Sequence, residues 1–247
     1  MRIDIITLFP EMVEAFLGES IIGRARKDNK IEINCHQLRD FSDNKWRRVD
    51  DTSYGGGMGL VIRCEPLARC TEHVISLFPE KPHVIYFSPK GRVFNQQVAI
   101  ELKEQHENLL FVCGHYEGVD QRYLDKYVDE EISIGDYVLT GGEIAAVAVA
   151  DAVARLCPGV LSSDECFEEE SHYGGLLEYP QYSKPSNWEG MEVPEILLSG
   201  NHEKIARWRR DQALIITKER RPDMFEKIVP DKKDLKSVGW LWKKSGR

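Results

Sequence analysis

Strand-like and helix-like hydrophobic patterns alternate along the first 160 residues, and this alternation constrains the fold more than any other feature of the sequence. The patterns predict strands over residues 2–9, 31–36, 83–88, 108–113 and 131–134. They predict helices after Pro10 and over residues 65–78, 95–105, 119–127 and 144–156. Because strands separated by helices pair in parallel, we expect an α/β fold with a mostly parallel sheet.

The character of the sequence changes after Pro158-Gly159. Residues 164–170, DECFEEE, include five acids in seven positions, a composition typical of a linker. Beyond them the sequence is polar and helical. We therefore predict a sheet domain over 1–160, a flexible acidic linker over 161–171 and a small helical domain over 172–247.

A long helix predicted over residues 201–221 has two contrasting faces. The apolar face is expected to hold Ile205, Trp208, Ile215 and Ile216, and the opposite face Lys204, Arg207, Arg210 and Lys218. A basic helix face is either simply exposed to water or in contact with nucleic-acid phosphates. The sequence leaves both alternatives open.

Composition excludes several classes of protein. The net charge of −8 argues against a protein that coats nucleic acid generally, although a local basic patch is compatible with it. The six cysteines are scattered without a CxxC pair, which predicts reduced packing residues and no metal site. The start, MRIDIITLFPEM, is interpreted as a strand and not a signal peptide, and no apolar run reaches the ~18 residues of a membrane helix. We expect a cytoplasmic protein.

Three predicted strands end in loops that mix glycine with polar side chains, at residues 88–91, 114–118 and 134–142. Ligands of open parallel sheets bind at the carboxyl ends of the strands, and glycine allows the backbone to approach them closely. Backbone groups there could hydrogen-bond an adenine and a ribose, while Glu117 and Asp136 would favour a cationic group. Each loop alone could be only a tight turn, but three at one edge favour a binding site.

The glycine-rich stretch 54–59, YGGGMG, is not a phosphate-binding motif. It lacks the Lys-Ser/Thr pair of a P-loop and the full G-x-G-x-x-G spacing of a dinucleotide fingerprint. We interpret it as a flexible segment that closes on a substrate, preceded by Asp50-Asp51.

The stretches VDDTSYGGGMG, CGHYEGVDQR, EISIGDYVLTGGE and ADAVARLCPGVL resemble the bacterial tRNA (guanine-N1)-methyltransferases, from ITLFPEM to HEKIARWR. These enzymes methylate the guanine at position 37, next to the anticodon. The resemblance implies a deep trefoil knot of the SPOUT type, bound S-adenosylmethionine, an obligate homodimer and the tRNA anticodon stem-loop as partner. Periodicity alone could not indicate the knot, since threaded chains are rare.

The resemblance also implies which residues form the cofactor site. The knotted segment corresponds to Ile134, Gly135, Asp136, Tyr137, Val138 and Leu139, whose backbone would hold the adenine and ribose. The remaining implied lining consists of Gly114, Tyr86, Ser88, Tyr116, Glu117, Gly141 and Gly142. His115 stands where the family often has arginine, which would make a charged contact there dependent on pH.

The implied catalytic residues are Glu170 and Arg155. Guanine N1 carries a proton, so methylation needs a general base, and Glu170 stands where the family usually has aspartate. Glu169 or a water is the alternative base. Arg155 matches the arginine that holds guanine O6, although a cation at a helix C-terminus is also stabilised by the helix dipole. The family depends on Mg²⁺, but the sequence has no tight ligand cluster, so no metal ligands are assigned.

Two other functions remain open on the sequence. A non-catalytic RNA-binding protein on a knotted scaffold would share the basic helix but would not bind S-adenosylmethionine. A Rossmann-type dehydrogenase is disfavoured by the missing fingerprint.

Overall fold

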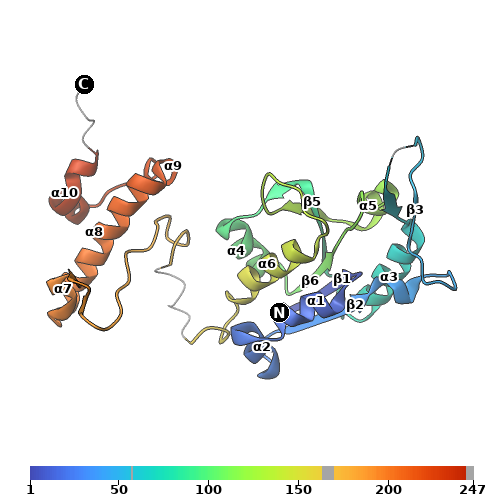
Figure 1. The fold of residues 1–247 in the computed structure, drawn as a ribbon, viewed down its shortest axis with the longest axis horizontal. Helices are drawn as coiled ribbons and strands as arrows, with labels where there is room; N and C mark the ends of the chain where they lie inside the picture. The colour runs from blue at the N-terminus through green and yellow to red at the C-terminus, as the bar shows by residue number, and fades with distance from the viewer. Residues whose placement is uncertain (57, 163–169, 243–247) are drawn as a thin grey trace. The chain divides into compact units, whose positions relative to one another are not determined.

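The computed structural model describes residues 1–56, 58–162 and 170–242. The chain forms two compact units, Met1–Asp164 and Glu165–Arg247 (Figure 1). Most of the predicted acidic linker, residues 163–169, lies outside the described residues, as does the alternative base Glu169.

The first unit is built on a five-stranded sheet with the order β2-β1-β6-β5-β7. Its strands are β1 (Arg2–Thr7), β2 (Glu32–Gln37), β5 (His83–Val93), β6 (Asn108–Val112) and β7 (Glu130–Ser133). All four strand pairs are parallel, so the carboxyl ends of the strands meet at one edge. The predicted mostly parallel α/β sheet is confirmed.

Helices cover both faces of the sheet (Figure 1). They are α1 (Pro10–Leu17), α2 (Ser20–Lys27), η1 (Leu38–Phe41), α3 (Cys64–Ser76), α4 (Gln96–Gln105), α5 (Gln121–Tyr127) and α6 (Glu143–Ala154). Helices α1 and α4 contact α6, whereas α3 contacts α5 and η1, which gives one helical group for each face.

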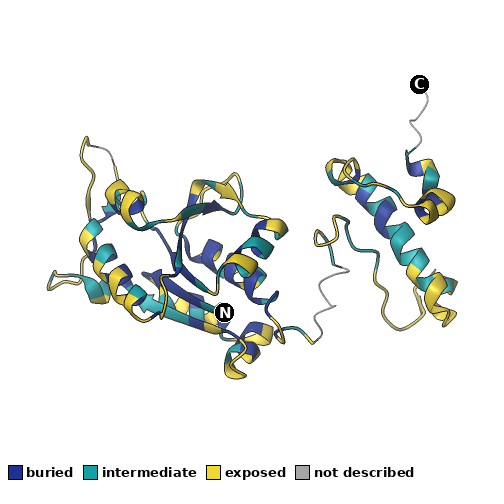
Figure 2. Cartoon of the chain, turned by 180° about the vertical axis from the view of Figure 1, so that it is seen from behind, coloured by how far each residue is buried: buried dark blue, intermediate teal, exposed yellow. Residues whose placement is uncertain are grey.

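The central strands β1, β5 and β6 are mainly apolar because both of their faces are buried. On β1, Ile6 packs into the cluster formed with α3 and α5, and Ile3 and Ile5 point to the other face by the alternation of a strand. Figure 2 shows these strands as buried ribbons between more exposed helices.

The sequence misses one feature of β5. The predicted strand ends at Ser88, but β5 continues to Val93, and both Phe87 and Arg92 pair with Ile132 across a bulge. Pro89 has no N–H to donate to a ladder, which favours a bulge at this point. A Cβ at Gly91 would lie 2.4 Å from the carbonyl carbon of Glu131, so this close approach requires glycine.

The glycine-rich stretch lies between two short strands. It connects β3 (Asp50–Thr52) and β4 (Leu60–Ile62), which form an antiparallel hairpin. Residue 57 in its turn is outside the described residues.

The second unit is mainly helical. Its elements are β8 (Asn187–Trp188), β9 (Met191–Glu192), α7 (Glu195–Leu198), α8 (His202–Arg220), α9 (Pro222–Phe225), α10 (Lys232–Val238) and η3 (Gly239–Trp242). Its small core holds Leu214, Phe225, Val238 and Leu241. None of the described helices is long and apolar enough to cross a membrane.

The predicted faces of α8 are right only in part. Its fully buried side chains are Ala213, Leu214 and Thr217. From the predicted apolar set, Ile215 packs against the core of the unit and the other three are half-buried. Arg207 and Arg210 turn inward and pair with the buried Asp234 of α10 at 2.9 and 3.1 Å. Lys218 donates to the Leu241 carbonyl. Three of the four predicted basic-face cations are therefore held by contacts within the unit, because α10 and η3 cover this side of α8.

Candidate functional site

A pocket of about 280 Å³ opens at the carboxyl edge of the sheet, where β5, β6 and β7 end. It contains, from the predicted cofactor set, Tyr86, Ser88, Gly114, Tyr116, Glu117, Ile134, Gly135, Tyr137, Val138, Leu139, Gly141 and Gly142. The three glycine-containing loops named from the sequence thus meet around one cavity. Its size is near the lower end of the ~300–1,000 Å³ range of small-molecule sites.

Asp136 is the exception, because it does not line the pocket. The N–H of Tyr137 donates to the Gly135 carbonyl at 2.9 Å, which places Asp136 in the middle of a three-residue turn. Its side chain is exposed. The role of this carboxylate toward the ligand stays a prediction.

The segment after β7 is held by hydrogen bonds to itself. Ser133 Oγ donates to the Gly135 carbonyl at 3.0 Å, and the Gly135 N–H lies 3.2 Å from the same hydroxyl. The Tyr137 hydroxyl donates to the Ile134 carbonyl at 3.3 Å. Val138 and Leu139, which follow, are exposed. The turn is therefore ordered while its last residues face the open side of the pocket.

The loops after β6 and β7 join at the base of the pocket. The Gly142 N–H donates to the Gly114 carbonyl at 2.8 Å, and His115 forms a β-bridge with Gly141. A Cβ at Gly114 would lie 2.5 Å from the Tyr86 hydroxyl. Glycine at 114 is thus required by close approach to an aromatic ring.

Tyr86 presents a neutral phenol to this site. Burial, reinforced by the nearby Glu131 carboxylate, raises its pKa to about 12. The hydroxyl therefore stays protonated at neutral pH and can donate a hydrogen bond.

A buried polar pair supports the base of the pocket from beneath. Thr7 Oγ1 donates to Glu143 Oε1 at 2.7 Å, and Thr7 also accepts the Phe9 N–H at 2.9 Å. Glu143 stands in the first turn of α6, where a carboxylate interacts favourably with the helix dipole. This pair fixes the start of α6 against β1.

His115 packs as an aromatic ring between Phe9 and Tyr116, with centroid distances of 5.3 and 5.0 Å. Its Nδ1 is buried and has no hydrogen-bond partner among the described residues. The predicted charged contact at this position has no counterpart within the described residues.

The comparisons with known proteins agree on one family. Residues 1–227 match the family described as tRNA (guanine-1)-methyltransferase TrmD. The chain belongs to this family. It is similar to the tRNA (guanine-N(1)-)-methyltransferase of Clostridium perfringens, with 53% identity over 96% of this chain and 98% of the relative. It is also similar to that of Alkaliphilus oremlandii, with 52% identity over 95% of this chain and 96% of the relative. The relative from Ruminiclostridium cellulolyticum is 50% identical over 92% of this chain and 97% of its own length.

The two catalytic residues implied by the family resemblance do not line the pocket. Arg155 is the C-cap of α6 in the first unit, and its backbone N–H donates to the Asp151 carbonyl at 3.0 Å. Glu170 is the first described residue after the 163–169 gap, within the second unit.

Several lining residues lie outside the loops and site residues named from the sequence. They are Phe87, Val119, Gln121, Leu124, Ile132, Ser133 and Ala145. Ser133 directly precedes the segment named from the resemblance, so a wider window would have found it. Gln121 and Leu124 belong to α5, and only the tertiary structure brings that helix to the pocket.

The described residues do not fit a resident metal ion, since they contain no group of three His, Cys, Asp or Glu side chains that could hold one. No step is therefore assigned to Mg²⁺. The five described cysteines, Cys35, Cys64, Cys70, Cys113 and Cys157, are free thiols.

Proposed function

We propose that this family member transfers a methyl group from S-adenosylmethionine to N1 of guanine 37 in tRNA, next to the anticodon. The observation that carries the proposal is the pocket at the carboxyl edge of the sheet, where three loops gather most of the cofactor residues named from the sequence. When bound, S-adenosylmethionine supplies a methyl group activated by the sulfonium charge.

The pocket residues would bind and orient the cofactor. Ile134 and Leu139 line the pocket, and their backbone groups would hold the adenine and ribose, while the Tyr86 hydroxyl remains a donor at neutral pH. The Glu117 carboxylate provides negative charge toward the cationic end of the ligand. Its backbone N–H donates to the Leu60 carbonyl at 3.0 Å, so the β3–β4 hairpin helps to hold it.

We also infer a trefoil knot in the first unit. Two contacts support it: β7 is the edge strand beside β5, and the chain then returns so that Gly142 bonds to Gly114. After this return, α6 packs against α1 and β1. In the sheet, β1 and β7 lie on opposite sides of β6. A chain that passes back through the loops after β5 and β6 would account for this route.

Glu170 is proposed as the general base and Arg155 as the electrophilic partner. As the bond between N1 and the methyl carbon forms, the bond from that carbon to the sulfonium sulfur would break and leave a neutral thioether, and the N1 proton would pass to the Glu170 carboxylate. The Arg155 guanidinium would hold O6 and stabilise negative charge that develops there. A positioned base is typically worth ~10²–10⁴ in rate.

A homodimer would bring Arg155 to the pocket. Gly142, at the start of α6, lines the pocket, while Arg155 ends the same helix. Twelve residues of α-helix span about 18 Å, so one protomer's Arg155 is far from its own pocket. The partner's Arg155 would complete the site if two copies pack through α1 and α6.

An exposed apolar stripe on these elements supports such packing. It consists of Phe9, Met12, Phe16 and Ile144, all exposed in the single chain. Sedimentation should show a dimer, and a fully active monomer would contradict this proposal.

The decisive experiment is nucleoside analysis by mass spectrometry after incubation with unmodified tRNA and S-adenosylmethionine. We expect 1-methylguanosine at position 37 and none when position 37 is adenine. A different methylated nucleoside would overturn the assignment. The alternative, a non-catalytic RNA-binding protein, requires that calorimetry detect no S-adenosylmethionine binding at millimolar concentration.

The base is tested separately with Glu170→Gln, which keeps the shape but accepts no proton. The kcat should fall by ~10²–10⁴, with the affinity for S-adenosylmethionine nearly unchanged. Glu170→Asp should retain most of the activity, since it keeps a carboxylate that can accept the N1 proton. A Gln variant with wild-type kcat would assign the base to Glu169 or to a water.

A further inference from the structure

The loop formed by residues 42–48, here called the Trp46 loop, presents an aromatic ring to solvent. The Trp46 side chain is 77% exposed, although tryptophan is usually well buried. Its neighbours are Lys45, Arg47 and Arg48, so NKWRR carries three cations and no acid in a chain of net charge −8. Lys45 Nζ lies 5.0 Å from the centroid of the indole ring.

The Trp46 loop holds this ring out by an internal network. Asn44 makes two of these hydrogen bonds. Its backbone N–H donates to Ser42 Oγ at 3.2 Å, and its side-chain oxygen accepts the backbone N–H of Trp46 at 2.7 Å. The Arg47 N–H donates to the Asn44 carbonyl at 2.7 Å. Arg47 has a φ of 56°, a left-handed conformation that is unfavourable for a residue with a side chain, and its guanidinium pairs with Asp40. The exposure of Trp46 is therefore built into the loop.

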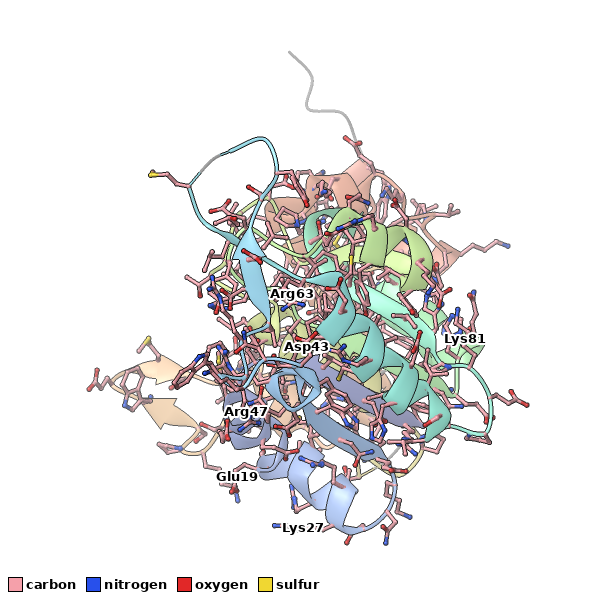
Figure 3. The ribbon with its side chains drawn as sticks, turned by 90° about the vertical axis from the view of Figure 1, so that its right-hand side faces the viewer. Glu19, Lys27, Asp43, Arg47, Arg63 and Lys81 are labelled. Carbon is pink, nitrogen blue, oxygen red and sulfur yellow. The ribbon has the colours of Figure 1, made fainter. Side chains whose placement is uncertain are left out.

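The Trp46 loop is tied to the wall of the cofactor pocket. The Arg63 N–H donates to the Val49 carbonyl at 2.9 Å, just after the loop. The preceding residue, Ile62, donates its N–H to the carbonyl of the pocket residue Gly118 at 3.0 Å. The loop also follows β2, whose carboxyl end lies at the same sheet edge as the pocket. Figure 3 shows Asp43, Arg47 and Arg63 together on one face of this unit.

An exposed aromatic ring among cations is the arrangement by which proteins bind single-stranded nucleic acid. A base stacks on the ring, and cations contact the flanking phosphates. Lys45 is available for this role, because it has no acidic partner among the described residues, whereas Arg48 lies 3.3 Å from Asp50.

We propose that an unpaired base of the tRNA anticodon loop stacks on Trp46, with Lys45 contacting an adjacent phosphate. This proposal rests on the proposed function and extends it, since it names the surface that holds the substrate RNA while guanine 37 occupies the site. A second copy of the chain is a less suitable partner for the Trp46 loop. The surface proposed to pack against a second copy is the apolar stripe of α1 and α6, which has no cluster of cations like that of the Trp46 loop.

The test compares Trp46→Ala with Trp46→Phe, which keeps a stacking surface. The probes are unmodified tRNA and its anticodon stem-loop RNA with 2-aminopurine in the loop, and calorimetry gives the S-adenosylmethionine affinity. We expect Trp46→Ala to raise the Kd for both RNAs about 5- to 150-fold, as for the loss of one stacked base, and to weaken the quenching of 2-aminopurine. Trp46→Phe should stay within a few-fold of wild type.

Two control variants are matched to the change. Leu77→Ala removes another exposed apolar side chain of the same unit. Lys81→Ala removes a cation that lies away from Arg47 in Figure 3, and its effect on RNA binding should be smaller than that of Lys45→Ala. Neither control should change the Kd for the stem-loop more than twofold.

Several results would overturn the proposal. They are wild-type RNA affinity in Trp46→Ala, equal losses in the Ala and Phe variants, an equal loss of cofactor affinity, or a change of oligomeric state. Wild-type protein that binds the stem-loop through Trp46 but forms no 1-methylguanosine would refute the proposed function alone. Methylation that persists unchanged in Trp46→Ala, with unchanged KM for tRNA, would refute this inference alone.

Discussion

Replacing Gly114 with alanine would place one methyl group against the wall of the pocket. The new Cβ would lie 2.5 Å from the Tyr86 hydroxyl and 2.9 Å from its Cε2, well inside the ~3.5–4.0 Å of a favourable contact. The Tyr86 side chain packs in the core cluster with residues of α3 and α5, so its ring cannot move further into the core. Either the ring shifts into the pocket or the 114–118 loop moves away. Overpacking of this kind typically costs ~1–3 kcal/mol.

If the cost falls on ligand binding, the Kd for S-adenosylmethionine should rise about 5- to 150-fold, since ~1.4 kcal/mol is a factor of ten. Isothermal calorimetry measures this directly, and a thermal melt of the free protein reports any share that falls on folding. The loss of binding free energy and the loss of folding free energy should together equal the overpacking cost of ~1–3 kcal/mol.

A double variant tests the geometric reason. Tyr86→Phe deletes the hydroxyl that lies 2.5 Å from the new Cβ but keeps Cε2 at 2.9 Å, so relief should be partial. We expect Gly114→Ala to cost less in the Phe background, by at least ~0.5 kcal/mol. Gly239→Ala is the control, because the nearest atom to its Cβ is 3.9 Å away. Unchanged cofactor affinity in Gly114→Ala, or strictly additive effects in the double variant, would refute the reasoning.

Three further predictions concern stability and RNA binding. Asp234→Ala should destabilise the second unit by about 2–4 kcal/mol in a denaturant titration, less than the ~3–5 kcal/mol of a fully buried pair because Arg210 is 41% exposed. Burial raises the pKa of Asp234, but hydrogen bonds from Arg210 and Arg207 outweigh this effect, so the net pKa is lowered. The stability that the ionised Asp234 contributes is therefore present above the unfolded pKa of about 4 and should be lost as the pH falls below it. The stability of Asp234→Asn should depend less on pH in this acid range. Lys204→Glu should weaken tRNA binding and reduce its salt dependence, while the thermal melt stays unchanged. Arg207→Glu should instead unfold the second unit, because Arg207 pairs with Asp234. A stable Arg207→Glu protein would contradict the packing described here.

The strands and helices of the first unit follow closely from the sequence. Residues 108–113 and 131–134 were predicted as strands, and the structure has β6 over Asn108–Val112 and β7 over Glu130–Ser133. For β6 the cause is local: a strand buried on both faces needs a continuous apolar run, and the polar residues at its ends set its limits. β7 is an edge strand, and the alternation of polar and apolar residues over 131–134 indicates it. The convergence of the three glycine loops also follows, because parallel strands bring their carboxyl ends to one edge.

The faces of α8 could not be derived in the same way. Helical periodicity places Arg207 and Arg210 on a polar side, but whether that side meets water depends on what packs against it. Asp234 lies 24 residues beyond Arg210 and supplies the buried carboxylate with which both guanidiniums pair. A periodic pattern contains no information about such a distant partner.

The sequence by itself therefore determined the five strands of the sheet, most of the helices of the first unit, the polarity of the loops and the family, but not α2, β3 or β4. The tertiary structure decided which of these loops share a cavity, that Asp136 does not line it, and that Trp46 is held in solvent. The physical reason is the sequence separation over which the different interactions act. Hydrophobic periodicity and glycine conformation act over a few residues, whereas a pocket wall or a buried ion pair depends on groups that only the folded chain brings within hydrogen-bond distance.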